Sequence, residues 1–443
     1  MLFTKRDITN IMVPLIIEQA LIVTVGMVDS IMVASAGEAA VSGVSLVDTI
    51  NILLVYIFSA LAGGGAVVIS QILGAKDYDK ANSASKQLVW TVFFASFFLM
   101  AISLVFRKQI LALIFGSIEP SVMKNAQIYF LFTAMSYPFL GIYNAGAAVF
   151  RAMGNSRISM IASAIMNVIN VIGNAILIFC FHMGAAGAAI ATLFSRIVGA
   201  ILIMILVQQK KNMIYVDNVF RFKPDFSIIK RILRIGVPNS LENGMFHFGK
   251  LLTQSLIATF GTAQIAANAV GNTLTSLQYI PGTAIGLTLI TVVGRCVGAG
   301  RKEEAKKYTI RLIGVNYAIL LGLSAVLCIF AKPLIGFYNL SPESSEIAYK
   351  LLLFHSVAVC TIWPVAFTLT NAFRAASDIK YPMILSAISM WVFRVGLSYV
   401  FSIYFNMGVF SVWFAMFCDW IFRAVIFAVR YIRGTWLTKY IAS

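Results

Sequence analysis

Residues 11–33 read IMVPLIIEQALIVTVGMVDSIMV and hold two carboxylates, Glu18 and Asp29, within a run that is otherwise mostly apolar. The run is long enough to cross the hydrocarbon core of a bilayer as a helix. An ionised carboxylate at that depth costs at least about 2.5 kcal/mol, so each of the two needs a use or a buried partner. At about 100° per residue the two side chains differ by about 20° in azimuth, so they share one helix face, roughly 16 Å apart along the axis.

The same stretch occurs a second time in the chain. Pro14 and Glu18 return as Pro238 and Glu242, an offset of 238 − 14 = 224. Further matches, at this offset or one residue short of it, pair Gly37 with Gly261, Gly74-Ala75 with Gly298-Ala299, Ala81 with Ala305, and Phe150-Arg151-Ala152 with Phe373-Arg374-Ala375. Two similar halves are typical of duplicated transporter folds.

The composition excludes a soluble globular protein. The 443 residues are 60% hydrophobic and 12% charged, and their mean hydropathy is +0.88, which is typical of polytopic membrane proteins. The net charge of +17 lies mostly in short loops between apolar runs, which argues against nucleic-acid binding. The five cysteines form no Cys-x-x-Cys pair, so neither a zinc site nor a disulfide framework is predicted. The first apolar run is too long for the core of a signal peptide, so we expect the first helix to be retained.

Apolar runs of about 20 residues predict twelve membrane-spanning helices. They cover residues 10–34, 43–73, 87–106, 125–150, 159–181, 185–208, 232–259, 266–294, 308–331, 349–373, 381–404 and 408–432. An even number of spans in each half gives both halves the same orientation, so the pseudo-twofold axis lies along the membrane normal. We predict an all-α polytopic membrane protein with two six-helix lobes: an N-terminal lobe at 1–208, a cytoplasmic linker at 209–231 and a C-terminal lobe at 232–443.

The basic residues predict how the chain is oriented in the membrane. Most Lys and Arg residues fall on one side, from Lys5 and Arg6 to Lys439. The opposite side holds mainly Arg107, Lys108, Lys124, Lys332 and Lys350. By the positive-inside rule, we expect both termini and the central linker to be cytoplasmic.

The seventh predicted span is the most polar. Its polar side chains lie within about 80° of one another on one helix face and are Asn239, Asn243, His247, Lys250 and Gln254. Glu242 borders this stripe. The stripe should face water, a substrate or the opposing half rather than lipid.

Polar residues in two other spans are further candidates. In the fifth span, Asn170 and Asn174 share a face; such amides bind ions through their oxygens or, more ordinarily, hydrogen-bond between helices. Asp48 begins the second span, and the 224 offset takes it to Asn272. Matched polar positions in both halves favour a shared internal cavity, although a merely hydrated Asp48 near the outer interface fits equally well.

Two arginines near the middle of their spans, Arg196 and Arg394, need negatively charged acceptors. The candidate acceptors are Glu18, Asp29, Asp48 and Glu242. Asp419 and Arg423 lie four residues apart on the last span, which predicts a structural ion pair.

We expect a transporter rather than an enzyme. The chain contains no Walker loop, no Gly-x-Ser-x-Gly and no His-Glu-x-x-His motif, and it has only three histidines. Without a nucleotide site, uphill transport would draw on an ion gradient, and intramembrane carboxylates are the usual ion or proton carriers. Asp29 is the better candidate for this coupling because Glu18 is repeated as Glu242, whereas the offset takes Asp29 to Thr253.

Over essentially its whole length the chain resembles the multidrug and toxic compound extrusion (MATE) family of cation-coupled efflux transporters. The similarity rests on Val28-Asp29-Ser30-Ile31-Met32, on Gln71-x-x-Gly74-Ala75 and on Arg151-Ala152-Met153-Gly154-Asn155. It implies two six-helix lobes around a V-shaped cavity, alternating access, and expulsion of organic cations in exchange for Na⁺ or H⁺.

The resemblance also implies roles for single residues. Asp29 matches the acidic residue of the first helix that serves in coupling and drug binding, and Asn170, Asn174 and Thr192 match an N-lobe cation or proton network. The chain departs from the family at Asn174, where some members have aspartate, which weakens the case for Na⁺. It departs again in the seventh helix, where some members place an acidic residue near position 246; Glu242 is the candidate substitute.

We therefore expect an antiporter that exports amphipathic, organic cations in exchange for H⁺ or Na⁺ and needs no other cofactor. We expect it to act as a monomer in a bacterial inner membrane. The alternative is a lipid or lipid-linked oligosaccharide flippase of the same superfamily, whose cavity would hold paired arginines and lysines. The site residues we predict are Asp29, Glu18, Asn170, Asn174, Thr192, Glu242, His247, Lys250 and Gln254.

Overall fold

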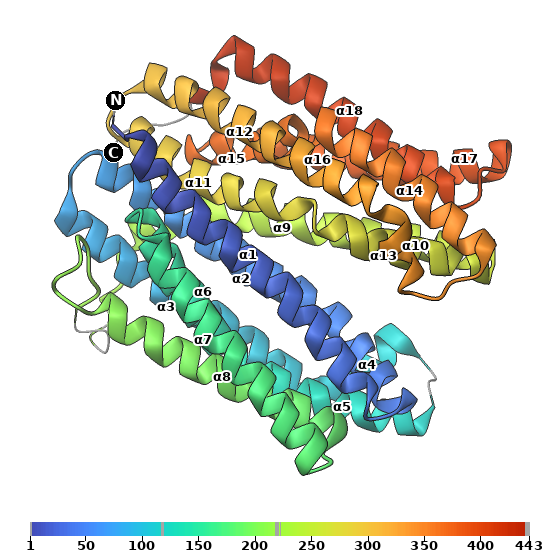
Figure 1. Ribbon diagram of the computed structural model, residues 1–443. Coiled ribbons are helices and arrows are strands. Elements are labelled where there is room, and N and C mark those ends of the chain that lie inside the picture. The colour runs from blue at the N-terminus through green and yellow to red at the C-terminus, as the bar shows by residue number, and fades with distance from the viewer. Residues whose placement is uncertain (1, 117–118, 218–220, 222, 439–443) are drawn as a thin grey trace. The chain divides into compact units, whose positions relative to one another are not determined.

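The computed structural model describes residues 2–116, 119–217, 221 and 223–438, and these are almost entirely helical (Figure 1). Lys439, one of the basic residues used to predict orientation, lies outside this described part. The chain forms two compact units. The N-unit is Lys5–Ser240, and the C-unit is Leu241–Ser443 together with Met1–Thr4.

The N-unit is a bundle of long helices. They are α1 (Lys5–Ala34), α2 (Glu38–Gly74), α3 (Tyr78–Val105), α4 (Arg107–Phe115), α5 (Pro120–Met135), α6 (Tyr137–Ala152), α7 (Ser156–Asn174) with the π-helical turn η1 (Ala175–Cys180), α8 (Gly184–Val207) and the first part of α9 (Phe226–Ile257). Helix α7 packs between α1 and α8, and α2 packs against α5 and α6 (Figure 1). Buried Val47, Phe58 and Phe130 belong to its apolar core.

The C-unit is built in the same way. Its helices are the rest of α9, η2 (Ala258–Phe260), α10 (Thr262–Ser276), α11 (Tyr279–Gly298), α12 (Lys302–Ile329), α13 (Ala331–Gly336), α14 (Pro342–Thr361), η3 (Pro364–Thr368), α15 (Thr370–Ala375), α16 (Lys380–Ser389), η4 (Met390–Gly396), α17 (Leu397–Phe405), α18 (Val409–Arg433) and η5 (Thr435–Thr438). The amino-terminal residues belong to this unit because Phe3 packs on Tyr308, whose hydroxyl accepts from the Phe3 amide at 2.9 Å.

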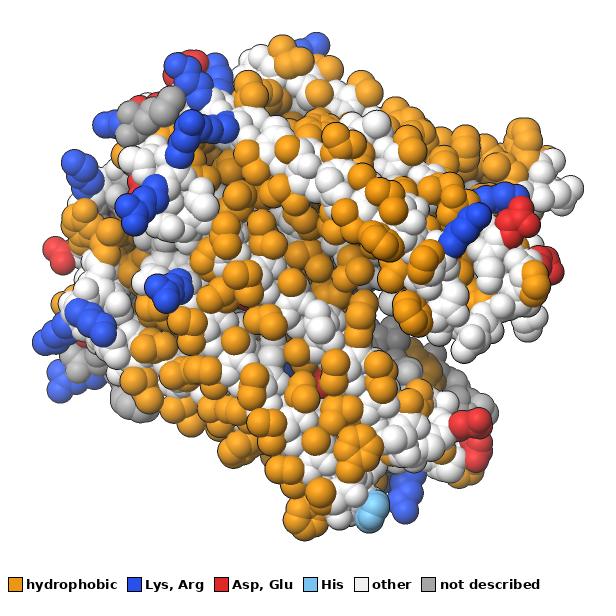
Figure 2. Space-filling view, viewed as in Figure 1, with side chains coloured by type: hydrophobic (Ala, Val, Ile, Leu, Met, Phe, Trp, Pro, Cys, Tyr) orange, Lys and Arg blue, Asp and Glu red, His pale blue; other side chains and the backbone are white. Residues whose placement is uncertain are grey.

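The helix surfaces are suited to lipid. Large apolar side chains such as Ile31, Val168 and Phe194 are more than half exposed. Figure 2 shows hydrophobic side chains covering the middle of the helices and Lys and Arg gathered near the helix ends. Among the described residues, nine helices are long and apolar enough to span a membrane, and ten if the bent pair Pro342–Thr361 and Pro364–Ala375 counts as one span.

The two remaining predicted spans correspond to helices that differ from a simple apolar rod. Helix α9 carries the polar stripe along its length, and the predicted span 125–150 is divided between α5 and α6. The break follows from Pro138, which lies in the first turn of α6, where its missing N–H costs no helical hydrogen bond. Pro364 has the same place in η3, where the chain bends by 57°. The predicted spans 125–150 and 349–373 are therefore each divided between shorter helical segments and are not single uninterrupted helices.

The division between the units falls inside α9. Asn239 and Ser240 donate to the backbone of α2, to Ala60 O at 3.5 Å and Ile57 O at 3.2 Å. A β-carbon added at Gly64 would lie 2.7 Å from the Gly236 nitrogen, so the first part of α9 packs on α2 through paired glycines, a common way for membrane helices to approach closely. The predicted lobe boundaries at residues 208 and 232 stay a prediction.

The repeat is visible in the backbone of both units. Gly37 precedes α2 with φ 97°, and Gly261 precedes α10 with φ 91°. Side-chain-bearing residues rarely adopt these angles. Both glycines therefore turn the chain at equivalent points of the two halves, 224 residues apart.

Candidate functional site

Asp29 lies at the centre of a hydrogen-bonded network in the N-unit. Asn174 Nδ2 donates to Asp29 Oδ1 at 2.8 Å. Amide orientations are assigned from their partners, and the orientation that satisfies Asn170 has its nitrogen donating to both Asp29 oxygens at 2.9 Å while its oxygen accepts from Thr192 Oγ1 at 3.2 Å. Four predicted residues from α1, α7 and α8 thus meet at one place.

Asp48 belongs to a second cluster in the same unit. Its Oδ1 accepts from Tyr129 OH at 3.1 Å and from Asn51 Nδ2 at 3.2 Å. Asp48 and the Arg196 guanidinium are close enough to Asp29 for their charges to interact. An internal cavity at Asp48 stays a prediction. Tyr129 was not predicted, because nothing in its local sequence separates it from an interfacial tyrosine.

Glu18 has different partners from Asp29. Arg151 Nη1 lies 3.4 Å from Glu18 Oε1, and Ser159 Oγ donates to Oε2 at 2.8 Å. Glu18 is 3% exposed. Glu18 and Asp29 both face α7, as their spacing predicts, but the structure does not join them in one network.

The C-unit repeats the Glu18 ion pair. Glu242 is 9% exposed, and its Oε2 lies 2.8 Å from Arg374 Nη2. Arg374 is the sequence counterpart of Arg151, as Glu242 is of Glu18. The two pairs therefore belong to the duplicated framework. Their arginines were missed as partners although the repeat already contained both of them.

The arginine partners correct one prediction. Arg394 Nη1 lies 3.8 Å from Asp419 Oδ2, so its acceptor is none of the four candidate carboxylates; α18 packs against η4 and brings Asp419 to it. Asp419 also accepts from Arg423 Nε at 2.8 Å, which confirms the predicted i,i+4 pair. Arg196 Nη1 donates to Ser136 Oγ at 2.6 Å.

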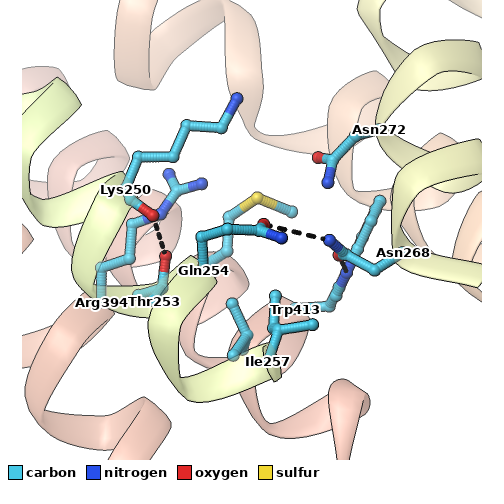
Figure 3. A pocket seen from close by; sticks show the side chains of 10 residues that line it. Lys250, Thr253, Gln254, Ile257, Asn268, Asn272, Arg394 and Trp413 are labelled. Carbon is cyan, nitrogen blue, oxygen red and sulfur yellow. Dashed lines mark hydrogen bonds between the residues drawn. The ribbon is translucent and has the colours of Figure 1, made fainter. Parts of the chain in front are cut away.

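A pocket in the C-unit contains two predicted residues, Lys250 and Gln254. The pocket opens to solvent, and its other lining residues are Thr253, Ile257, Asn268, Asn272, Arg394, Val412, Trp413 and Met416. Lys250 and Arg394 reach in from one side and Asn268 and Asn272 from the other (Figure 3). His247, one turn before Lys250, is not among the lining residues of this pocket.

The amides of this pocket are held in place by hydrogen bonds. Trp413 Nε1 donates to Asn268 Oδ1 at 2.9 Å, and Asn268 Nδ2 donates to Gln254 Oε1 at 3.3 Å. Because Asn268 takes up the Gln254 oxygen, the Gln254 amide presents its nitrogen as a donor. Asn268 and Trp413 were not predicted, since they come from α10 and α18, which only the fold brings to α9.

These features define a class of protein. Two repeated helical units carry buried ion pairs as a framework, and each holds a polar site within apolar, membrane-spanning helices; this is the architecture of a secondary transporter.

The comparison with known proteins identifies the family. The MatE family model matches residues 14–176 and again residues 238–400, two stretches with the 224-residue offset found in the sequence. The chain belongs to the MatE family of multidrug and toxic compound extrusion (MATE) transporters. Members of this family are efflux transporters and not enzymes.

Individual relatives agree with this assignment over nearly full length. The chain is 26% identical to a probable multidrug resistance protein NorM of Thermotoga maritima, over 98% of this chain and 93% of that protein. It is 24% identical to the uncharacterized transporter YisQ of Bacillus subtilis, over 96% and 94%. A solved outward-facing MATE transporter of the MOP superfamily has the same fold, with a TM-score of 0.91 at 20% identity, over 98% of this chain and 96% of that one. The chain is thus a multi-pass membrane protein with the twelve-helix, two-lobe MATE fold.

Proposed function

We propose that this chain is an antiporter that exports amphipathic, organic cations by alternating access in exchange for H⁺ or Na⁺. The observation that carries the proposal is the setting of Asp29. Glu18, Glu242 and Asp419 each have an arginine within 4.0 Å, whereas Asp29 forms no ion pair within the described ranges and is held by two asparagine amides. A membrane carboxylate whose charge is not matched by an arginine attracts a cation from outside the protein.

Protonation of Asp29 is the proposed release step. The ionised carboxylate accepts strong, charge-assisted hydrogen bonds from Asn170 and Asn174 and attracts a bound cation. A proton on Asp29 removes that negative charge, so the affinity for a cationic substrate falls. A ligand shifts the equilibrium between the inward-open and outward-open states only if it binds one of them more tightly than the other. The exchange of a proton for the substrate at Asp29 would therefore also favour one of these two states.

Sodium is the second candidate for the coupling ion. Na⁺ is a hard cation, for which carboxylate, amide and hydroxyl oxygens are suitable ligands. Asn174 Oδ1 is buried with no hydrogen-bond partner among the described residues, and the nitrogen of the same amide donates to Asp29 Oδ1 at 2.8 Å. An uncompensated buried acceptor is costly, and a bound cation would satisfy it.

The proposal also covers the membrane, the orientation and the oligomeric state of the transporter. We place it as a monomer in a bacterial inner membrane with both termini and the linker between the halves on the cytoplasmic side, in agreement with the distribution of basic residues. The multidrug resistance names of its NorM relatives support a drug-like substrate. We propose no cofactor other than the coupling ion.

Reconstituted transport tests the proposal. Purified protein in proteoliposomes is given ethidium as a cationic substrate, with Na⁺ and H⁺ gradients imposed one at a time. We expect one of the two gradients to drive ethidium uphill and Asp29→Asn to abolish this, with exposed Asp79→Asn as the matched control. Uphill transport at an undiminished rate by Asp29→Asn would refute the coupling role of Asp29.

A flippase is the second candidate function, because Lys250 and Arg394 together line the C-unit pocket and paired cations suit a lipid phosphate. The same proteoliposomes, loaded with a fluorescent anionic phospholipid, distinguish the two. Gradient-independent translocation of the lipid, without ethidium transport, would favour the flippase.

A further inference from the structure

The pocket in the C-unit carries positive charge that the surrounding protein balances only in part. Its lining residues include Lys250 and Arg394 but no carboxylate. The carboxylate nearest to Arg394 is Asp419, 3.8 Å away, and Asp419 already pairs with Arg423 at 2.8 Å. In the part of the chain that the structure describes, Lys250 forms no ion pair. Lys250 therefore lies beside the pocket without an anion of its own, and Arg394 shares Asp419 with Arg423.

The guanidinium of Arg394 is buried and only partly partnered. Its residue is 8% exposed, and its Nε has no hydrogen-bond partner among the described residues. The guanidinium lies over the Phe246 ring at 5.1 Å, which orients it without satisfying its N–H groups. An unsatisfied buried donor on a charged group is costly. An anion that enters the pocket would offset the positive charge of this partly partnered guanidinium.

The other lining residues suit an organic anion rather than a bare one. The Gln254 and Asn272 amides can donate hydrogen bonds, and Trp413 and Met416 supply apolar and aromatic surface. Ligand pockets commonly combine an apolar lining with a few polar groups that set orientation. Lys250 contributes a point charge, while the planar arginine fork matches the two oxygens of a carboxylate or phosphate.

We infer that this C-unit pocket binds the anionic group, a carboxylate or a phosphate, of an amphipathic compound that the transporter exports. The inference rests on the proposed export function and extends it to substrates that carry an anionic group, which Lys250 and Arg394 in the C-unit would favour.

A matched pair of dyes tests the inference in proteoliposomes. Rhodamine B carries a free carboxylate beside its cationic ring system, and its ethyl ester carries the cation alone. We expect Lys250→Gln to raise the KM for rhodamine B about tenfold, the effect of losing one hydrogen bond to a charged group, and to leave the ester unchanged. Exposed Lys302→Gln is the matched control and should change neither dye. Arg394→Gln should act like Lys250→Gln, provided that it elutes as the same species in gel filtration.

Competition identifies the source of the anionic group. Benzoate and phenyl phosphate are tested separately as inhibitors of rhodamine B transport. The stronger inhibitor shows whether the pocket prefers a carboxylate or a phosphate. Two results would overturn the inference but leave the export function standing, provided that the wild type transports the ester. One is an unchanged KM for rhodamine B in Lys250→Gln. The other is failure of the wild type to transport rhodamine B at all. Transport of neither dye would contradict the export function itself.

Discussion

The polar site of the N-unit and the pocket of the C-unit occupy equivalent positions in the repeat but have opposite charge. The 224 offset takes Asp29 to Thr253 and Asp48 to Asn272, both of which line the C-unit pocket. In the other direction, Lys250 replaces Gly26. The two carboxylates of the N-unit thus correspond to neutral residues in the C-unit, where Lys250 supplies a positive charge.

The framework around these two sites did not diverge. Glu18 with Arg151 and Glu242 with Arg374 form the same ion pair in both units, and Gly37 and Gly261 make the same turn. The difference between site and framework teaches that the two halves share the residues that hold the helices together and differ in those of the proposed ligand sites. Four predictions probe this division.

The largest difference is expected between Asp29→Asn and Thr253→Asn, substitutions at equivalent positions. Asp29→Asn should reduce gradient-driven ethidium transport by on the order of a hundredfold, because it removes the carboxylate that carries the coupling ion. Thr253→Asn should change the same rate by less than about threefold, since it alters no charge. Equal losses of ethidium transport in the two variants would mean that Asp29 is no more important for transport than its repeat counterpart Thr253.

Breaking the repeated ion pair should destabilise both units to a similar degree. Arg151→Gln leaves Glu18 buried without its cation, and Arg374→Gln does the same to Glu242. Each should cost about 3 kcal/mol or more, seen as a lower Tm in a thermal-shift assay in detergent. Adding Glu18→Gln to Arg151→Gln, and Glu242→Gln to Arg374→Gln, should restore part of the loss. A marked loss in only one half would refute the idea of a shared framework.

A second carboxylate in the N-unit site should make the site more negative and increase its affinity for Na⁺. Asn174→Asp places a new carboxylate beside Asp29, because the amide nitrogen that it replaces lies 2.8 Å from Asp29 Oδ1. The added negative charge should strengthen Na⁺ binding at least about tenfold, as measured by the Na⁺ concentration that half-saturates transport. Exposed Asn10→Asp is the matched control and should leave Na⁺ dependence as it is.

The smallest effect is expected at the repeated turns. Gly37→Ala and Gly261→Ala should each cost about 1 kcal/mol, because both positions have positive φ and an alanine there is strained. A β-carbon at either position has no heavy atom within 4 Å, so the cost comes from the backbone alone. Equal small shifts of Tm are expected, and Gly314→Ala, which lies at an ordinary helical φ with open space, should cause no loss.

The local sequence predicted most of the N-unit site. The spacing of Asn170 and Asn174 and the family resemblance of Asp29 and Thr192 led to four residues that the structure brings together. Prediction failed where partners come from distant segments. Asp419 was missed as the acceptor of Arg394, and Asn268 and Trp413 were missed as pocket residues, because periodicity describes one helix at a time and does not say which helices cross.

The sequence by itself determined the membrane location, the duplication and the presence of costly charges in apolar spans, because hydrophobic run length and repeated motifs are properties of the chain alone. Only the tertiary structure decided which charges cancel. Glu18 and Glu242 are neutralised by arginines more than 130 residues away, while Asp29 is held by neutral amides and Lys250 lies beside an open pocket. Electrostatic energy depends on distance and burial, and both arise only when the helices pack.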